Sequence, residues 1–205
     1  MPADSPLRAS PLAMTVLFML VAEPLHPYEM QRRMKLWGKD LVVNVSQRAT
    51  LYKLIDRLLE AGLIAVRSVE RDQRFPERTV YELTDAGART ARAWLIDMLA
   101  VPRNEFPRFP AALSFVMMLE PEEARTVLEQ RAAGLREQLA ALDEAMSPSR
   151  GPLPPRVTLL DGELVRTMLA TELSFVESVI AELRSGTLSW SEAELREAGS
   201  QFLGD

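Results

Sequence analysis

The sequence predicts a mainly α-helical protein of the α+β class, with one β-hairpin near its middle and a wholly helical second part. Two observations support this prediction. Apolar residues recur at helical spacing over most of the 205 residues, whereas residues 63–83 contain two short β-type runs around a polar turn. A segment with three prolines, residues 102–110, follows the fourth expected helix. We therefore expect two domains, residues 1–101 and 102–205.

Two helices are expected at the start of the first domain. Ser10 and Pro11 provide an N-cap and a first-turn proline for a helix over residues 12–22. Because that helix is apolar nearly all round, we expect it to be buried, either within one chain or between two subunits. The next helix is expected over residues 28–37. The single histidine, His26, stands between them beside prolines, where a loop or capping role is expected rather than a metal ligand.

The third expected helix, residues 45–62, has two different faces. Ser46 suits its N-cap and Gly62 its C-terminal end. Apolar residues at helical spacing must face a core, and these are Leu51, Leu54, Ile55, Leu58 and Leu59. The other face carries cationic and hydrogen-bonding side chains, namely Gln47, Arg48, Thr50, Lys53 and Arg57. Such a face can donate hydrogen bonds to phosphates and base edges of DNA, although a solvated amphipathic helix would show the same pattern.

The segment after this helix favours the DNA-binding interpretation. Residues 63–70 and 79–83 are expected to be strands, and the tip between them is basic, with Arg71, Arg74 and Arg78. Helices followed by a hairpin with a basic tip are typical of a winged helix-turn-helix with a two-stranded wing. The charge distribution agrees with it. Residues 30–79 carry eleven basic and six acidic side chains, whereas residues 101–205 carry ten and seventeen, on a chain of net charge −5.

These segments resemble the PadR family of transcriptional regulators. The resemblance depends on Thr50-Leu51-Tyr52, Arg57-Leu58, Gly62-Leu63-Ile64 and the run from Arg78 to Gly87. It covers residues 12–99 well, and the helical second part is typical of the family's long form. The resemblance implies a phosphate contact at Tyr52 and a further DNA contact at Tyr28. Family members place a glycine before the latter tyrosine, whereas this chain has Pro27.

The fourth helix is expected from Asp85 to about Ala100, with Thr84 as its N-cap. Its predicted buried stripe consists of Ala88, Ala91, Leu95, Met98 and Leu99, with Trp94 just beside it. Family members that sense aromatic compounds use a tryptophan on the corresponding helix. Trp94, Met98, Phe106 and Phe109 are therefore candidates for binding a small aromatic effector. Simple packing of Trp94 at a dimer interface is the alternative, because large aromatic side chains dominate interfaces without any ligand.

The second domain is expected to be an all-α, coiled-coil-like dimerisation domain. A short helix over residues 111–119 precedes two long helices, over residues 120–146 and about 156–185, and a weak helix is expected over residues 191–198. Both long helices have apolar residues at coiled-coil spacing. These seams are Leu128, Leu135 and Leu142 with Ala132, Leu139 and Met146, and then Leu169, Leu173, Val176, Ile180 and Leu183. An intrachain helical hairpin or a dimer interface would each explain them.

Composition and motifs exclude most other classes of function. The chain has no cysteine, one histidine and none of the common nucleotide-binding, hydrolase or metalloprotease motifs, so we expect no enzyme, cofactor or metal site. The longest apolar run, residues 12–22, is too short to span a bilayer, so a cytoplasmic protein without a membrane partner is expected.

We therefore expect a DNA-binding transcriptional regulator. The resemblance implies a repressor, and we expect a homodimer that binds an inverted-repeat operator in double-stranded DNA. A winged-helix protein-interaction module without DNA binding is the alternative, which an acidic or apolar face on the third helix would have favoured.

Overall fold

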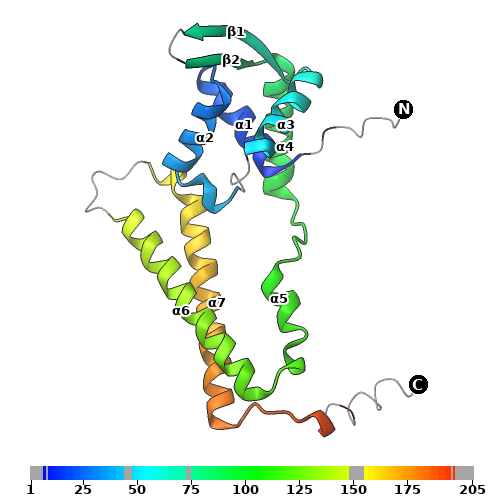
Figure 1. Cartoon of the computed structure of the whole chain (residues 1–205), viewed down its shortest axis with the longest axis vertical. Coiled ribbons are helices and arrows are strands. Elements are labelled where there is room, and N and C mark those ends of the chain that lie inside the picture. Colours follow the sequence, from blue (N-terminus) through cyan, green and yellow to red (C-terminus); the bar gives the residue numbers. More distant parts are fainter. Residues whose placement is uncertain are drawn as a thin grey trace. The chain divides into compact units, whose positions relative to one another are not determined.

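The computed structural model describes residues 7, 9–43, 48–72, 75–147, 155–194 and 196. The chain divides into two units, Met1–Arg103 and Asn104–Asp205, and each is described by itself (Figure 1). The order of elements is mainly helical with a single two-stranded antiparallel sheet, which confirms the predicted fold class. Among these residues, no helix combines the length and the apolar character needed to cross a membrane.

Local capping interactions begin the first two helices, α1 (Pro11–Ala22) and α2 (Pro27–Leu36). The Ser10 hydroxyl accepts a hydrogen bond of 3.2 Å from the Ala13 N–H. The Nδ1 atom of His26 accepts one of 3.2 Å from the Glu29 N–H, so the expected capping role of His26 is confirmed. A 3₁₀ turn, η1 (Lys39–Leu41), follows α2 after Gly38, which has a left-handed φ of 64°.

The core of the first unit lies where α1 packs against α3, α4 and β2. Its largest fully buried side chains include Leu17, Met30, Met34 and Leu58. Of the two alternatives for the burial of α1, complete burial within one chain is not found, because Phe18 and Val21 are each 64% exposed. Within the described residues of the first unit, one face of α1 therefore has no covering element.

The third helix, α3 (Arg48–Glu60), ends as the sequence predicts. Gly62 has a φ of 67°, its N–H donates to the Leu59 carbonyl, and the Leu63 N–H donates to the Leu58 carbonyl. These two bonds form a Schellman motif, which needs the left-handed glycine. The predicted apolar stripe is buried except for Leu59, which is 36% exposed because it lies at the edge of the stripe. The predicted N-cap, Ser46, lies outside the described residues.

The wing consists of β1 (Ile64–Asp72) and β2 (Phe75–Leu83), paired antiparallel from Ile64 opposite Leu83 to Asp72 opposite Phe75. The strands extend well into residues 71–78, which the sequence predicts as a turn. A two-stranded ribbon can keep polar side chains in solvent while its backbone ladder continues, so a polar composition did not end these strands. An isolated bridge between Leu25 and Tyr81 links the segment before α2 to β2.

The fourth helix, α4 (Asp85–Ala100), begins at the expected Thr84 cap, whose hydroxyl accepts a 3.0 Å hydrogen bond from the Gly87 N–H. The predicted buried stripe is right at Ala91 but wrong at Ala88, which is exposed, and at two leucines. Gly87, Ala91 and Trp94 face the core, whereas Leu95 and Leu99 are exposed, Leu99 by 79%. A Cβ on Gly87 would lie 1.9 Å from the Leu63 carbonyl oxygen, and this close approach sets the rotation of the helix. Trp94 therefore lies on the inward stripe rather than beside it.

In the described part of the second unit, the elements before the last helix are α5 (Arg108–Leu113), η2 (Val116–Met118), α6 (Pro121–Ala145) and η4 (Arg156–Thr158). The last helix is α7 (Leu160–Ser185), which ends at Gly186 with a φ of 75°. It begins four residues later than expected because the first residues form the 3₁₀ turn η4. The weak helix expected over residues 191–198 falls partly outside the described residues.

Helices α6 and α7 form an antiparallel hairpin (Figure 1). Their coiled-coil seams pack against each other, with Leu128, Ala132 and Leu135 meeting Val176 and Ile180. Of the two explanations for the seams, the structure therefore supports the helical hairpin within one chain. After α7, the Trp190 Nε1–H donates a 3.0 Å hydrogen bond to the Leu119 carbonyl, which ties the end of this helix to the start of α6.

Candidate nucleic-acid interface

The exposed surface of α3 has two flanks of different charge. Tyr52 and Asp56 lie on the flank toward the wing, where both are close enough to interact electrostatically with the Tyr81 hydroxyl of β2. Partial burial first, and then the negative charge of Asp56, raise the pKa of the Tyr81 hydroxyl. We call Tyr52 and Asp56 the wing flank of α3.

The other flank carries Thr50, Lys53 and Arg57, and we call it the N-terminal flank because it faces the segment that enters α1. A hollow of about 590 Å³ separates the two segments. Its lining residues are Ser10, Pro11, Leu12, Val43, Thr50, Lys53, Leu54 and Arg57. Two cationic side chains therefore line one concave site, on the helix that the sequence singles out for DNA contact.

The two arginines of α2 and Arg67 of β1 already have carboxylate partners. Arg33 bonds to Glu23 at 2.6 Å and to Glu29 at 2.9 Å, and Arg32 bonds to Glu29 at 2.7 Å. Hydrogen bonds from both arginines lower the pKa of Glu29 from 4.5 to about 2. By contrast, Lys53 and Arg57 form no ion pair or hydrogen bond within the part of the chain that the structure describes. Lys53 and Arg57 thus place unpaired positive charge on the exposed side of α3.

Two tyrosines expected to contact DNA lie at the protein surface. Tyr28 is in the first turn of α2, and its ring stacks on His26 with centroids 6.1 Å apart. Tyr52 of the wing flank is also exposed. Both rings are therefore accessible to a molecule that approaches the helices α2 and α3.

The remaining predicted DNA contacts are only partly described. Arg78 is half-buried on β2, where it pairs in register with Glu70. Arg48 is the first residue of α3 and Arg71 lies near the end of β1, but of these two only the backbone is described. Gln47 and Arg74 lie outside the described residues.

The four residues expected at an effector site belong to different units. Trp94 and Met98 are half-buried in the first unit, where Trp94 packs against the core. In the second unit, Phe106 is 79% exposed, whereas Phe109 packs on the α6–α7 core beneath the Arg131 guanidinium, 3.6 Å from its ring centroid. Trp94 and Phe109 thus each have a packing role within their own unit.

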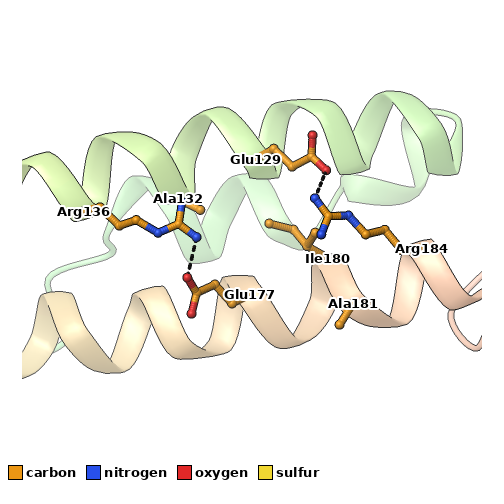
Figure 2. A pocket seen from close by; sticks show the side chains of 7 residues that line it. All are labelled: Glu129, Ala132, Arg136, Glu177, Ile180, Ala181 and Arg184. Atoms are coloured by element: carbon orange, nitrogen blue, oxygen red, sulfur yellow. Dashed lines mark hydrogen bonds and ion pairs between the residues drawn. The ribbon is translucent and has the colours of Figure 1, made fainter.

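A second hollow, of about 450 Å³, lies between α6 and α7 (Figure 2). Ala132, Ile180 and Ala181 contribute its small and apolar lining residues. Two ion pairs cross between the helices there, Arg136 with Glu177 at 2.5 Å and Arg184 with Glu129 at 2.7 Å. Because both guanidiniums already have carboxylate partners, this hollow offers no unpaired charge to an anionic ligand. The described residues also contain no group of acidic or histidine side chains suited to a metal ion.

The sequence did not predict that Ser10, Pro11 and Leu12 line the hollow beside α3. No sequence pattern links them to Lys53 and Arg57, because residues more than forty positions apart in the chain come together here only through the packing of α1 against α3. The sequence did single out the cations themselves, from their place on the polar face of the helix.

Comparison with known proteins agrees with this geometry. Residues 16–93 match the model of the transcriptional regulator PadR-like family. Solved structures with the same fold include Bacillus subtilis PadR in complex with operator DNA, at 20% identity and a TM-score of 0.69 over 84% of this chain and 98% of that one. No curated protein matches the chain.

Two further structures extend the similarity. Bacillus subtilis PadR in complex with p-coumaric acid is 19% identical, with a TM-score of 0.66 over 84% of this chain and 98% of that one. The Vibrio cholerae virulence activator AphA is 17% identical, with a TM-score of 0.63 over 85% and 98%. At this coverage the shared fold continues beyond residue 93 into the helical second unit. Residues 16–93 are thus similar to the PadR-like family of transcriptional regulators, and the likeness in fold extends over most of the chain.

Proposed function

We propose that this protein is a transcriptional regulator that binds double-stranded DNA through α3 and the wing. The observation that supports this most directly is the pair of unpartnered cations, Lys53 and Arg57, on the exposed side of α3. Cations without acidic partners at a concave surface attract phosphates, which dominate the affinity of proteins for DNA. The Bacillus subtilis PadR structure that contains operator DNA supports the same use of this fold.

In this proposal, α3 enters the major groove with Gln47, Arg48 and Thr50 nearest the base edges. Tyr28, Tyr52, Lys53 and Arg57 contact phosphates. The wing residues Arg71, Arg74 and Arg78 reach the backbone or the minor groove. Base contacts determine which sequence is bound, whereas phosphate contacts position the protein and make binding sensitive to salt.

We also propose a homodimer that binds an inverted repeat, with half-sites about 34 Å apart, one turn of DNA. The seams of α6 and α7 cannot supply the interface, since each is buried against the other within one chain. A second apolar stripe on α7 is exposed instead. It comprises Leu160, Leu164, Met168 and Phe175, at a spacing of four, four and seven residues. Helical spacing places this stripe on a different side of α7 from the seam, where a second copy can cover it.

Repression and an effector complete the proposal. Repression rests on the family resemblance. The Bacillus subtilis PadR structure that contains p-coumaric acid supports a small aromatic effector, for which Trp94, Met98, Phe106 and Phe109 remain the candidate residues. An effector must bind one conformation better than another, since equal affinity for both would not change DNA binding. Tryptophan fluorescence with planar aromatic acids, compared between the parent and Trp94→Phe, tests whether a ligand lies at this residue.

The experiment for DNA binding compares the full-length parent with Lys53→Ala and Arg57→Ala. Each replacement should weaken binding to a mixed-sequence duplex and lower the slope of log K against log salt by about one. Arg136→Ala is the matched control, because Arg136 is paired with Glu177 and belongs to the other unit. Parent-like binding by both α3 variants would argue against α3 as the DNA-contacting helix and favour a winged-helix protein-interaction module.

A further inference from the structure

The hollow between the start of α1 and α3 is a site that the DNA-binding function alone does not explain. Three residues of its wall, Ser10, Pro11 and Leu12, belong to the segment that enters α1 rather than to the helix-turn-helix or the wing. Across from them, α3 presents Lys53 and Arg57. A cationic helix face can contact DNA without any residues opposite it, so DNA contact by α3 alone does not explain why Ser10, Pro11 and Leu12 lie across the hollow.

The two cations are arranged unfavourably unless an anion lies near them. Lys53 and Arg57 are four residues apart on α3, so their side chains are neighbours on one side of the helix. Like charges at this spacing destabilise a helix slightly. Asp56 and Glu60 follow Lys53 and Arg57 by three residues on the same helix, but neither forms an ion pair with them among the described residues.

The comparison with the second hollow strengthens this point. There, Arg136 and Arg184 also line a concave site, but each bonds to a glutamate of the opposite helix (Figure 2). Among the described residues, none of those that line the hollow beside α1 is acidic. The same kind of side chain is thus neutralised within the protein at one hollow and left available at the other.

We propose that the hollow between Ser10 and the Lys53–Arg57 pair binds a phosphate group of the DNA backbone, so that the segment entering α1 forms part of the DNA interface. This inference rests on the proposed DNA binding. The ammonium of Lys53 and the guanidinium of Arg57 supply charged donors to the phosphate oxygens. The Ser10 hydroxyl accepts the capping bond from Ala13, and its own proton remains available as a donor.

The test changes the charge at Ser10, which lines the hollow, and keeps a side chain there that can still cap α1. Asparagine and aspartate are both good N-cap residues, so Ser10→Asn and Ser10→Asp should both preserve α1. Only the aspartate puts a negative charge into the hollow, where it repels a phosphate and pairs with Lys53 or Arg57. We expect Ser10→Asp to bind a 30-base-pair mixed-sequence duplex about tenfold more weakly than Ser10→Asn at low salt, a difference of roughly 1.4 kcal/mol.

Two controls separate this effect from others. Gln130→Glu adds the same charge to an exposed position of α6 and should leave DNA binding unchanged, which excludes an effect of net charge. Circular dichroism of both Ser10 variants checks that α1 is intact. Free phosphate is the other source of the same chemistry, and inorganic phosphate is therefore titrated against the parent and Ser10→Asp at constant ionic strength, with thermal stability as the readout.

The outcomes are distinct. If the parent does not bind the duplex, the proposed function itself fails. If the parent binds and loses affinity in Lys53→Ala, but Ser10→Asp binds DNA as well as Ser10→Asn, the hollow does not receive a backbone phosphate and this inference is overturned while the function stands. Stabilisation of the parent by inorganic phosphate, combined with equal DNA binding by the two Ser10 variants, would assign the hollow to a free anion and would likewise overturn it.

Discussion

Replacing Gly87 by alanine should destabilise the first unit, although the same change usually stabilises a helix. Gly87 is in the first turn of α4, where an added Cβ would lie 1.9 Å from the Leu63 carbonyl oxygen and 2.8 Å from Cδ1 of Leu83. The Leu83 side chain can rotate away, but the carbonyl belongs to the backbone between α3 and β1. Relief therefore requires that α4 or the start of the wing move.

Two opposing terms set the size of the effect. Alanine favours a helix over glycine by about 1 kcal/mol. Over-packing of a close contact costs about 1–3 kcal/mol, and the upper end applies where the obstacle is backbone. We expect the free energy of unfolding of the first unit to fall by about 2 kcal/mol. Gly134→Ala in α6 is the matched control, because nothing lies within 4 Å of its added Cβ, and it should stabilise the second unit by about 1 kcal/mol.

Hydrogen exchange measured by mass spectrometry suits this comparison, because it reports on α4 and α6 in separate peptides. Gly87→Ala should lower the protection of peptides from α1, α3 and α4, and Gly134→Ala should raise the protection of peptides from α6. Urea denaturation followed by circular dichroism supplies the total effect. Equal or higher stability of Gly87→Ala would show that α4 does not approach Leu63 as closely as the structure has it, and would remove the explanation for the orientation of Trp94.

Two further predictions concern assembly and pH. Met168→Glu should give monomers in light scattering, because this side chain is 63% exposed in one chain but would be buried by a second copy; Gln130→Glu should stay dimeric, and a dimeric Met168→Glu would exclude the α7 stripe as the interface. Glu29 contributes stability that is complete above its ordinary pKa of 4.5 and is lost as pH falls toward about 2, because hydrogen bonds from Arg32 and Arg33 lower its pKa. The difference in unfolding free energy between the parent and Glu29→Gln should therefore shrink over that range, and a constant difference would contradict this account.

The features that the sequence predicted correctly depend on residues close together in the chain. Ser10, Thr84 and Gly62 start or end their helices through bonds that span three to five residues, and such signals are visible in any short window. The intrachain packing of α6 on α7 was one of two explanations that the seam pattern left open. The pattern shows that a face is apolar and does not show which apolar surface covers it.

The sequence-based predictions failed where contacts between distant parts of the chain determine which face of a helix is buried. The apolar pattern of α4 is compatible with more than one buried stripe, and the contact of Gly87 with Leu63 selected the one that contains Trp94. The same limit applies to the candidate site. The cations of α3 could be chosen from the sequence, whereas the opposite wall at Ser10 could not, because only the packing of α1 brings it there.

Helix α7 has two different sides. One side packs on α6 and is bordered by ion pairs, and the other carries the exposed apolar stripe proposed for the dimer interface. Ion pairs from α6 to α7, such as Arg136 with Glu177 and Arg184 with Glu129, border the hollow of Figure 2 and are partly exposed. Covering this side by a second copy would remove paired charges from water, which often costs more than their attraction returns. The stripe that contains Met168 has no such cost, since its exposed residues are mainly apolar. We therefore expect a second copy of the chain to bind the apolar stripe of α7, while the charged side of the α6–α7 hairpin stays in solvent.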